Sequence, residues 1–290
     1  MAIDVIVGYD GSPAAAAAID TGAALFPQAH AWIMHLWTPP FASESLRQRL
    51  WTGAADINAF IEAIEREGEA EARRLAETGV RLARTAGWDA EPLVRRTYGG
   101  EGLYVAQLVQ DMNADLVLLG SRGLGGARAV LGSVSDMVVH YTPRPVLVVP
   151  HPLLSAEQDV LANGPVLIGW DGSPGAEAAF AAAQRLFLGR DLVLVSVDGA
   201  QSPSPAGSQP PVEGITVHRV DIASGSGPLG RAVAEALASA GRSRGAAALV
   251  VGSRGRSAVR EILTGSVAMA TLHHAHRPVI VVPRPHEGSV

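Results

Sequence analysis

The chain has 290 residues, 48% of them hydrophobic and 18% charged, so it is long enough for two domains of ordinary size and apolar enough to bury their cores. Its formal net charge of −5 argues against a nucleic-acid-binding surface. The chain has no cysteine and all 23 of its basic residues are arginine, which excludes disulfides, thiol catalysis, Schiff-base chemistry on a lysine and the P-loop GxxxxGK[ST].

The amino-terminal sequence MAIDVIVGYDGS has neither the basic region nor the apolar region of a signal peptide. No apolar run approaches the roughly 20 residues that a membrane span requires. We therefore expect a cytoplasmic protein.

Short apolar runs alternate with helical patterns in the first half of the chain. Strands are expected near residues 3–8, 31–36, 91–96, 115–119 and 146–149, and helices near 13–25, 44–86 (with a break), 102–113 and 133–141. The strands are rich in Val, Leu and Ile without polar alternation, as in strands that are buried on both faces. The pattern predicts an α/β fold with a parallel sheet covered by helices on both sides.

Three blocks of the first half recur in the same order in the second half. VIVGYDGSP returns as VLIGWDGSP, VLLGSRG as LVVGSRG, and RPVLVVP as RPVIVVP. The repetition predicts two homologous domains, 1–150 and 165–290, joined by a linker at 151–164. Strands of the second half are expected near 166–170, 192–197, 215–221, 247–251 and 279–282. Because 198–214 is rich in Pro, Ser and Gly, we expect the second domain to lack the helix after its second strand.

Each half contains a glycine loop between an apolar strand and a helix. Such a junction directs unpaired N–H groups and the positive end of the helix toward the carboxyl edge of a parallel sheet, where they suit an anion. Ser133 and Ser266 either donate hydroxyl hydrogen bonds there or cap their helices. Arg122 and Arg254 either add positive charge or lie in solvent. The loop glycines are Gly120, Gly123 and Gly132 in the first half and Gly252, Gly255 and Gly265 in the second.

An aspartate follows the first strand of each half, Asp10 in GYDGS and Asp171 in GWDGS. A carboxylate at a strand end suits a ribose hydroxyl. The sequence Asp-Gly-Ser-Pro is also a favourable turn and helix start, so both roles stay open. If the first strand lies beside the strand that ends in GSRG, the aspartate and the glycine loop face one crevice and fit a nucleotide.

These blocks resemble the universal stress protein family. The family signature G-x2-G-x9-G-[ST] is matched in full from Gly252 to Ser266, and from Gly120 to Ser133 with eight spacer residues in place of nine. The resemblance implies two doubly wound domains with strand order 3-2-1-4-5, paired through their last strands at 146–149 and 279–282. It also implies ATP binding, with the adenine held by backbone at the end of the second strand.

By position, the resemblance puts the adenine at Leu36 in the first half and at Val197 in the second. The candidate site residues also include Val134 and Val267, which follow the signature serines. Neither half matches the family pattern throughout, because the first has the shorter loop and the second lacks a helix. At least one ATP site is expected, and the two halves are not ranked.

The sequence favours a regulatory protein that binds ATP with Mg²⁺ and has no dedicated catalytic step, so any hydrolysis should be slow. The resemblance implies a role in stress adaptation, and besides the internal domain pair we expect a homodimer. Two alternatives stay open. One is an interaction scaffold that binds no nucleotide, and the other is an ATP-consuming enzyme in which Asp10 or Asp171 positions a metal ion.

Overall fold

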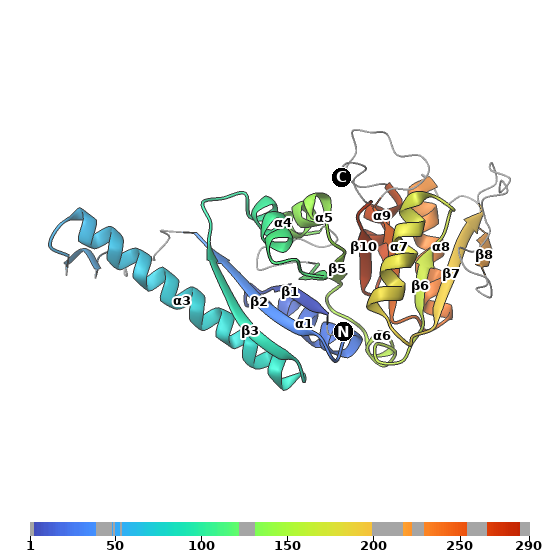
Figure 1. The fold of residues 1–290 in the computed structure, drawn as a ribbon, viewed down its shortest axis with the longest axis horizontal. Coiled ribbons are helices and arrows are strands. Elements are labelled where there is room, and N and C mark those ends of the chain that lie inside the picture. The colour runs from blue at the N-terminus through green and yellow to red at the C-terminus, as the bar shows by residue number, and fades with distance from the viewer. Residues whose placement is uncertain are drawn as a thin grey trace.

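The computed structural model describes residues 3–38, 48, 50–52, 54–121, 131–198, 217–221, 229–253 and 266–284. These residues form one ten-stranded sheet with helices on both faces (Figure 1). The strands are β1 Asp4–Gly8, β2 His30–Trp37, β3 Asp89–Arg96, β4 Leu116–Gly120, β5 Val146–Val149, β6 Val166–Gly169, β7 Leu192–Asp198, β8 Val217–Asp221, β9 Ala248–Gly252 and β10 Val279–Val282. The helices are α1 Pro13–Leu25, α3 Ile57–Thr85, α4 Glu101–Asp111, α5 Ser133–Tyr141, α6 Ser155–Gln158, α7 Pro174–Leu186, α8 Leu229–Ser243 and α9 Ser266–His274.

The strand order is β3-β2-β1-β4-β5-β10-β9-β6-β7-β8. Strand pairs within each half are parallel, and β5 and β10 pair antiparallel with Val279 opposite Val148. Counted from either outer edge, the order within a half is 3-2-1-4-5. The α/β class, this strand order and the pairing of 146–149 with 279–282 are therefore confirmed.

The side chains of successive strand residues alternate between two hydrophobic clusters, one on each face of the sheet. In β1, Val5 and Val7 lie in the cluster under α1, α3 and α7, whereas Ile6 lies in the cluster under α4, α5, α8 and α9. Both clusters continue across the β5–β10 junction. On the first face, the rings of Phe26 and Phe187, which end α1 and α7, lie 5.0 Å apart. The two halves thus share their core.

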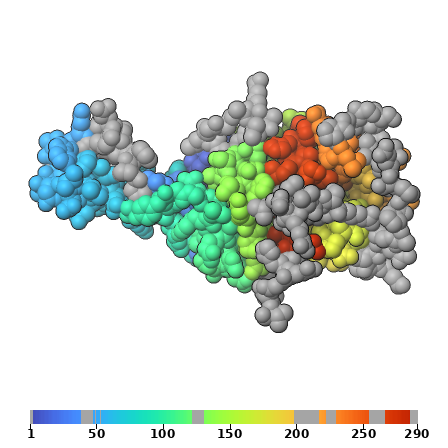
Figure 2. Space-filling view, turned by 90° about the horizontal axis from the view of Figure 1, so that it is seen from above, coloured from blue at the N-terminus to red at the C-terminus, as the bar shows by residue number. Residues whose placement is uncertain are grey.

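Helix α3 is longer than the strands it covers. It runs antiparallel to β2, and its Gly68 lies against the indole of Trp37, the last residue of β2. The turns of α3 that precede Gly68 therefore extend beyond the carboxyl edge of the sheet, and Figures 1 and 2 show this arm projecting from the molecule. Ile57 and Ile61 on the arm are 60% and 48% exposed, and Trp51, in the short helical stretch before α3, is 55% exposed.

The predicted break in the helical stretch 44–86 lies at residues 54–56, which are not helical. Residues 48 and 50–52 are helical, and α3 then begins after its N-cap Asp56, whose carboxylate accepts a hydrogen bond from the Ala59 N–H at 2.9 Å. Trp51 packs edge-on against Phe60, so the two helical stretches contact each other across the break.

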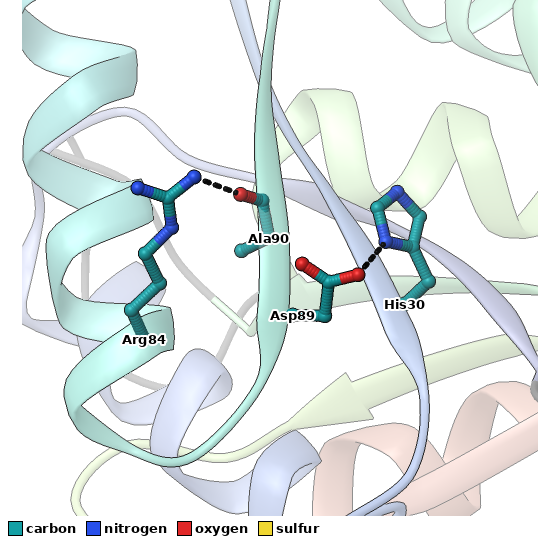
Figure 3. A network of polar contacts seen from close by, with 4 residues as sticks. All are labelled: His30, Arg84, Asp89 and Ala90. Carbon is teal, nitrogen blue, oxygen red and sulfur yellow. Dashed lines mark hydrogen bonds and ion pairs between the residues drawn. The ribbon is translucent and has the colours of Figure 1, made fainter.

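Polar contacts join α3, β3 and β2 at the amino edge of the sheet (Figure 3). The Arg84 guanidinium donates to the Ala90 carbonyl at 2.9 Å, and His30 Nδ1 lies 3.2 Å from an Asp89 carboxylate oxygen. This edge is opposite the strand ends where the glycine loops begin, so these titratable groups belong to the scaffold rather than to the predicted site.

Residues 198–214, where the second half was predicted to lack a helix, fall almost entirely outside the described residues. Between 151 and 164 the chain forms the single turn of α6, and the Arg190 guanidinium donates to the carbonyls of Leu161 and Gly164. Among the described helices, none is long and apolar enough to cross a membrane.

Candidate functional site

The predicted site lies where the winding of the first half reverses. Strand β1 pairs with β2 on one side and with β4 on the other, and Val7 lies opposite Leu118. Continuing that register brings Tyr9 level with Gly120, so the Asp10 turn and the end of β4 are neighbours at the carboxyl edge. In the second half, β6 lies between β7 and β9 in the same way. Open α/β sheets bind ligands at such reversal points.

Asp10 and Asp171 each fold back on the backbone of the turn that starts the next helix. An Asp10 carboxylate oxygen accepts from the Ser12 N–H at 2.9 Å, and Asp171 accepts from the Ser173 N–H at 3.0 Å. The caps of α1 and α7 are the serines, which accept from the N–H groups of Ala15 and Ala176. The helix-cap role considered for the aspartates therefore belongs to the serines. The aspartates orient the turn and hold their carboxylates at the sheet edge.

Gly120 and Gly252 are needed for close packing between a strand end and a helix start. A Cβ on Gly120 would lie 2.8 Å from the carbonyl oxygen of Ala14 in α1, and a Cβ on Gly252 would lie 2.4 Å from that of Gly175 in α7. The amides that follow are already bonded in the sheet, since Ser121 N–H donates to Val149 and Ser253 N–H to Val282. At these two positions the missing side chain makes room for a helix, and it does not by itself provide a phosphate cradle.

Helices α5 and α9 begin at the same edge and turn their first amides toward it. Gly132 is the N-cap of α5 and donates its own N–H to the Ser121 carbonyl at 3.0 Å. Ser133 and Ser266, the first helical residues, are exposed, and Val134 and Val267 pack on the cluster under these helices. The Ser133 side chain does not cap α5. The first amides of a helix have no partner within it, so those at these two starts suit an anion.

The backbone of Leu36 and Val197 faces a gap in the sheet. Alternate residues of a strand turn their N–H and C=O to the same side. The Met34 carbonyl accepts from Tyr9 N–H, so Leu36, two residues further on, also faces the β1 side, where β1 has ended at Gly8. In the second half the Val195 carbonyl accepts from Trp170 N–H, so Val197 faces the gap beyond Gly169. This is the polar edge that could pair with a base.

Two polar residues of the first-half site were not foreseen in the sequence. His35 Nδ1 lies 2.8 Å from the Tyr9 carbonyl, and because a carbonyl only accepts, this nitrogen carries the proton and donates. The buried Ser135 hydroxyl donates to the Gly120 carbonyl at 3.1 Å. Both bonds hold a strand end in place. Only the register of the sheet brings these partners together, 26 and 15 residues apart in the chain.

Five predicted site residues, Arg122, Gly123, Arg254, Gly255 and Gly265, lie outside the described residues. Within the part of the chain that is described, no group of three or more His, Asp or Glu side chains is arranged to hold a metal ion. Asp10 and Asp171 hold one carboxylate at the sheet edge in each half, and Asp136 lies in the first turn of α5.

The model of the family described as "Universal stress protein family" matches residues 1–150 and 228–283. A universal stress protein of Mycolicibacterium smegmatis is 30% identical, and the alignment covers 96% of both chains. One from Mycobacterium tuberculosis is also 30% identical, over 73% of this chain and 77% of its own length. Among solved structures, a universal stress protein from Archaeoglobus fulgidus covers 98% of this chain and 97% of its own, with a TM-score of 0.63 and 19% identity.

Proposed function

Because the chain belongs to the universal stress protein family, we propose that it is a stress-response regulator that binds ATP with Mg²⁺ at the carboxyl edge of its sheet. The base would bond to the backbone of Leu36 or Val197, and the ribose to Asp10 or Asp171. The phosphates would meet the helix starts at Ser133 or Ser266. The glycine loops before these helices, with Arg122 and Arg254, would complete the phosphate site.

One observation carries the proposal. In each half, the last bond between the second strand and the end of the first is accepted by the carbonyl of Met34 or Val195. Two residues further on, Leu36 or Val197 turns its backbone toward the gap left by the first strand. In both halves that gap adjoins an oriented aspartate and a helix start. Base, sugar and phosphate need these three kinds of partner in this order, and the same set occurs twice.

Magnesium fits the chemistry of the site only in part. Mg²⁺ usually takes one or two carboxylates together with phosphate oxygens and water. Asp10 and Asp171 are proposed for the ribose, and the first half adds Asp136 in the first turn of α5, so the ion would depend mainly on the nucleotide for its ligands. Bound there, it would neutralise phosphate charge. In the first half, His35 uses Nδ1 to hold the Tyr9 carbonyl near the proposed base position, away from the proposed phosphates, so slow hydrolysis is the expectation.

The test is calorimetric titration of the full chain with ATP, with and without Mg²⁺. Asp10→Ala and Asp171→Ala, made singly and together, should weaken or abolish binding at their own sites. The matched variants Asp10→Asn and Asp171→Asn keep an oxygen that can accept from the serine amide, so they preserve the turn while removing the charge. Loss of affinity in the asparagine variants therefore reports on the ligand rather than on the turn. Unchanged binding in the double asparagine variant would contradict the ribose role.

A scaffold without nucleotide remains the second candidate, and specific contacts favour it. The aspartates and the glycines at 120 and 252 already have structural roles, in the turns and in helix packing. A chain that shows no heat of binding at millimolar ATP and carries no nucleotide through purification would be such a scaffold.

The domain limits 1–150 and 165–290, the linker 151–164 and pairing with a second copy of the chain are also proposals. Limited proteolysis and light scattering test them directly.

A further inference from the structure

The two candidate sites differ in how firmly their strand ends are held. His35 and Ser135 bind the carbonyls of Tyr9 and Gly120 in the first half. By register, Ser196 takes the place of His35 in the second half, and Ala268 takes that of Ser135 as the third residue of its helix. Alanine has no side-chain donor, so the second edge lacks the bond made by Ser135. A preformed edge binds with less ordering cost than one that must be fixed by its ligand.

The two sites also differ in the residues beyond the base position. In the first half, Trp37 lies opposite Arg96 in the β2–β3 register, and Leu36 lies opposite Arg95. In the second half, the equivalent pairs are Asp198 opposite Asp221 and Val197 opposite Val220. Strand β3 thus carries Arg95 and Arg96 at the positions where β8 carries Val220 and Asp221.

The arginines of the first edge are not fully neutralised by their neighbours. Arg96 donates to Glu65 at 2.6 Å and stacks between Trp37, 5.8 Å from its ring centroid, and Tyr98, at 4.8 Å. Glu65 offsets one of the two positive charges, and Arg95 is exposed. A nucleoside triphosphate carries several negative charges, so the long-range field of Arg95 and Arg96 favours it in the first half and the field of Asp221 disfavours it in the second.

Resting on the proposed function, we propose that the first half is the nucleotide site of this chain. The second half binds ATP about tenfold more weakly, because Arg95 and Arg96 with Glu65 leave the first edge about one positive charge, whereas β8 has the negative charge of Asp221. The full glycine signature of the second half does not decide occupancy. Strand-end anchoring and the charge of the neighbouring strand pair decide it.

The full chain is titrated with MgATP in three forms: wild type, Asp10→Asn and Asp171→Asn. The expected result is one tight site per chain, lost in Asp10→Asn and retained in Asp171→Asn. Two equal sites, or loss of the tight site in Asp171→Asn alone, would overturn the assignment while leaving nucleotide binding intact. No heat with any form would instead refute the proposed function itself.

A second pair of variants tests the charge argument. Arg95→Asp, which gives the first edge an acidic residue, should weaken MgATP binding about tenfold at low salt and less at high salt, because the effect is electrostatic. Arg73→Asp is the matched control, since Arg73 is an exposed arginine bonded to Glu69 within α3. Equal weakening by both variants, or by neither, would refute the role of the edge charge.

Discussion

Tyr9 is a buried phenol at the end of β1, beside the candidate site. Burial raises its pKa above the ordinary value of 10.0, the nearby Asp10 carboxylate raises it further, and Arg81 opposes the shift. In an absorbance titration of the native protein, one tyrosine should therefore ionise later than a free phenol does. Tyr9→Phe should remove this late component, and its persistence in that variant would show that another residue causes it.

The same shift has a consequence for stability in alkali. Above pH 10 the unfolded chain loses the Tyr9 proton while the folded chain still holds it, so the unfolded state binds fewer protons. The free energy of unfolding should then fall as pH rises from about 10 toward the folded pKa. The urea midpoint of wild type should fall relative to that of Tyr9→Phe over this window, because phenylalanine lacks the penalty.

Single residues also show what the sequence could and could not predict. The sequence predicted that Asp10 and Gly120 lie at strand ends, and the structure has them there. Their contacts were not predictable, because Gly120 packs against Ala14 more than a hundred residues earlier in the chain. A glycine required by a neighbouring backbone and a glycine required by a phosphate look the same in a single sequence.

At the scale of elements, the contact between α3 and β2 depends on a small residue. A Cβ on Gly79 would lie 2.6 Å from an Ile33 methyl carbon and 2.8 Å from the Tyr9 ring. Alanine gains about 1 kcal/mol over glycine in a helix interior, but overpacking costs about 1–3 kcal/mol. Gly79→Ala should therefore lower the free energy of unfolding by about 1 kcal/mol in urea denaturation.

The exposed Glu77, two residues away on the same helix, provides the control. Glu77→Ala should change the free energy of unfolding by no more than about 0.5 kcal/mol, as is usual for a surface change. A Gly79→Ala protein more stable than wild type would mean that α3 lies further from β2 than these distances indicate.

Element types were predictable from the apolar runs, but the projecting arm of α3 was not predictable. The short Val, Leu and Ile runs of β1, β4 and β5 indicate buried strands. The helical pattern in 60–87 gave a helix but could not show that its amino-terminal turns pass the end of β2. The projection of α3 depends on where the neighbouring strands end, and the periodicity of one segment carries no information about the length of another.

At the scale of the whole molecule, repetition in the sequence predicted two similar halves, and the structure joins them into one continuous sheet. The repeat predicted which strands resemble each other. The repeat did not predict the shared core. That core depends on pairs such as Phe26 and Phe187, which are 161 residues apart and carry no sequence signal of contact.

Because both hydrophobic clusters cross the β5–β10 junction, the chain should unfold as one unit. Phe26→Ala removes a buried ring from the junction and should cost about 3–5 kcal/mol. Its effect should reach β6 and β7, whose amide hydrogens should exchange faster although the change lies in the first half. Ile33→Val, inside the first half, is the milder control at about 0.5–1.5 kcal/mol.

Phe26→Ala and Phe187→Ala should also be non-additive by about 0.5–3 kcal/mol, because the two rings contact each other. Exchange that speeds up only in β1–β5, with additive effects of the two changes, would mean that the halves unfold independently despite their shared sheet.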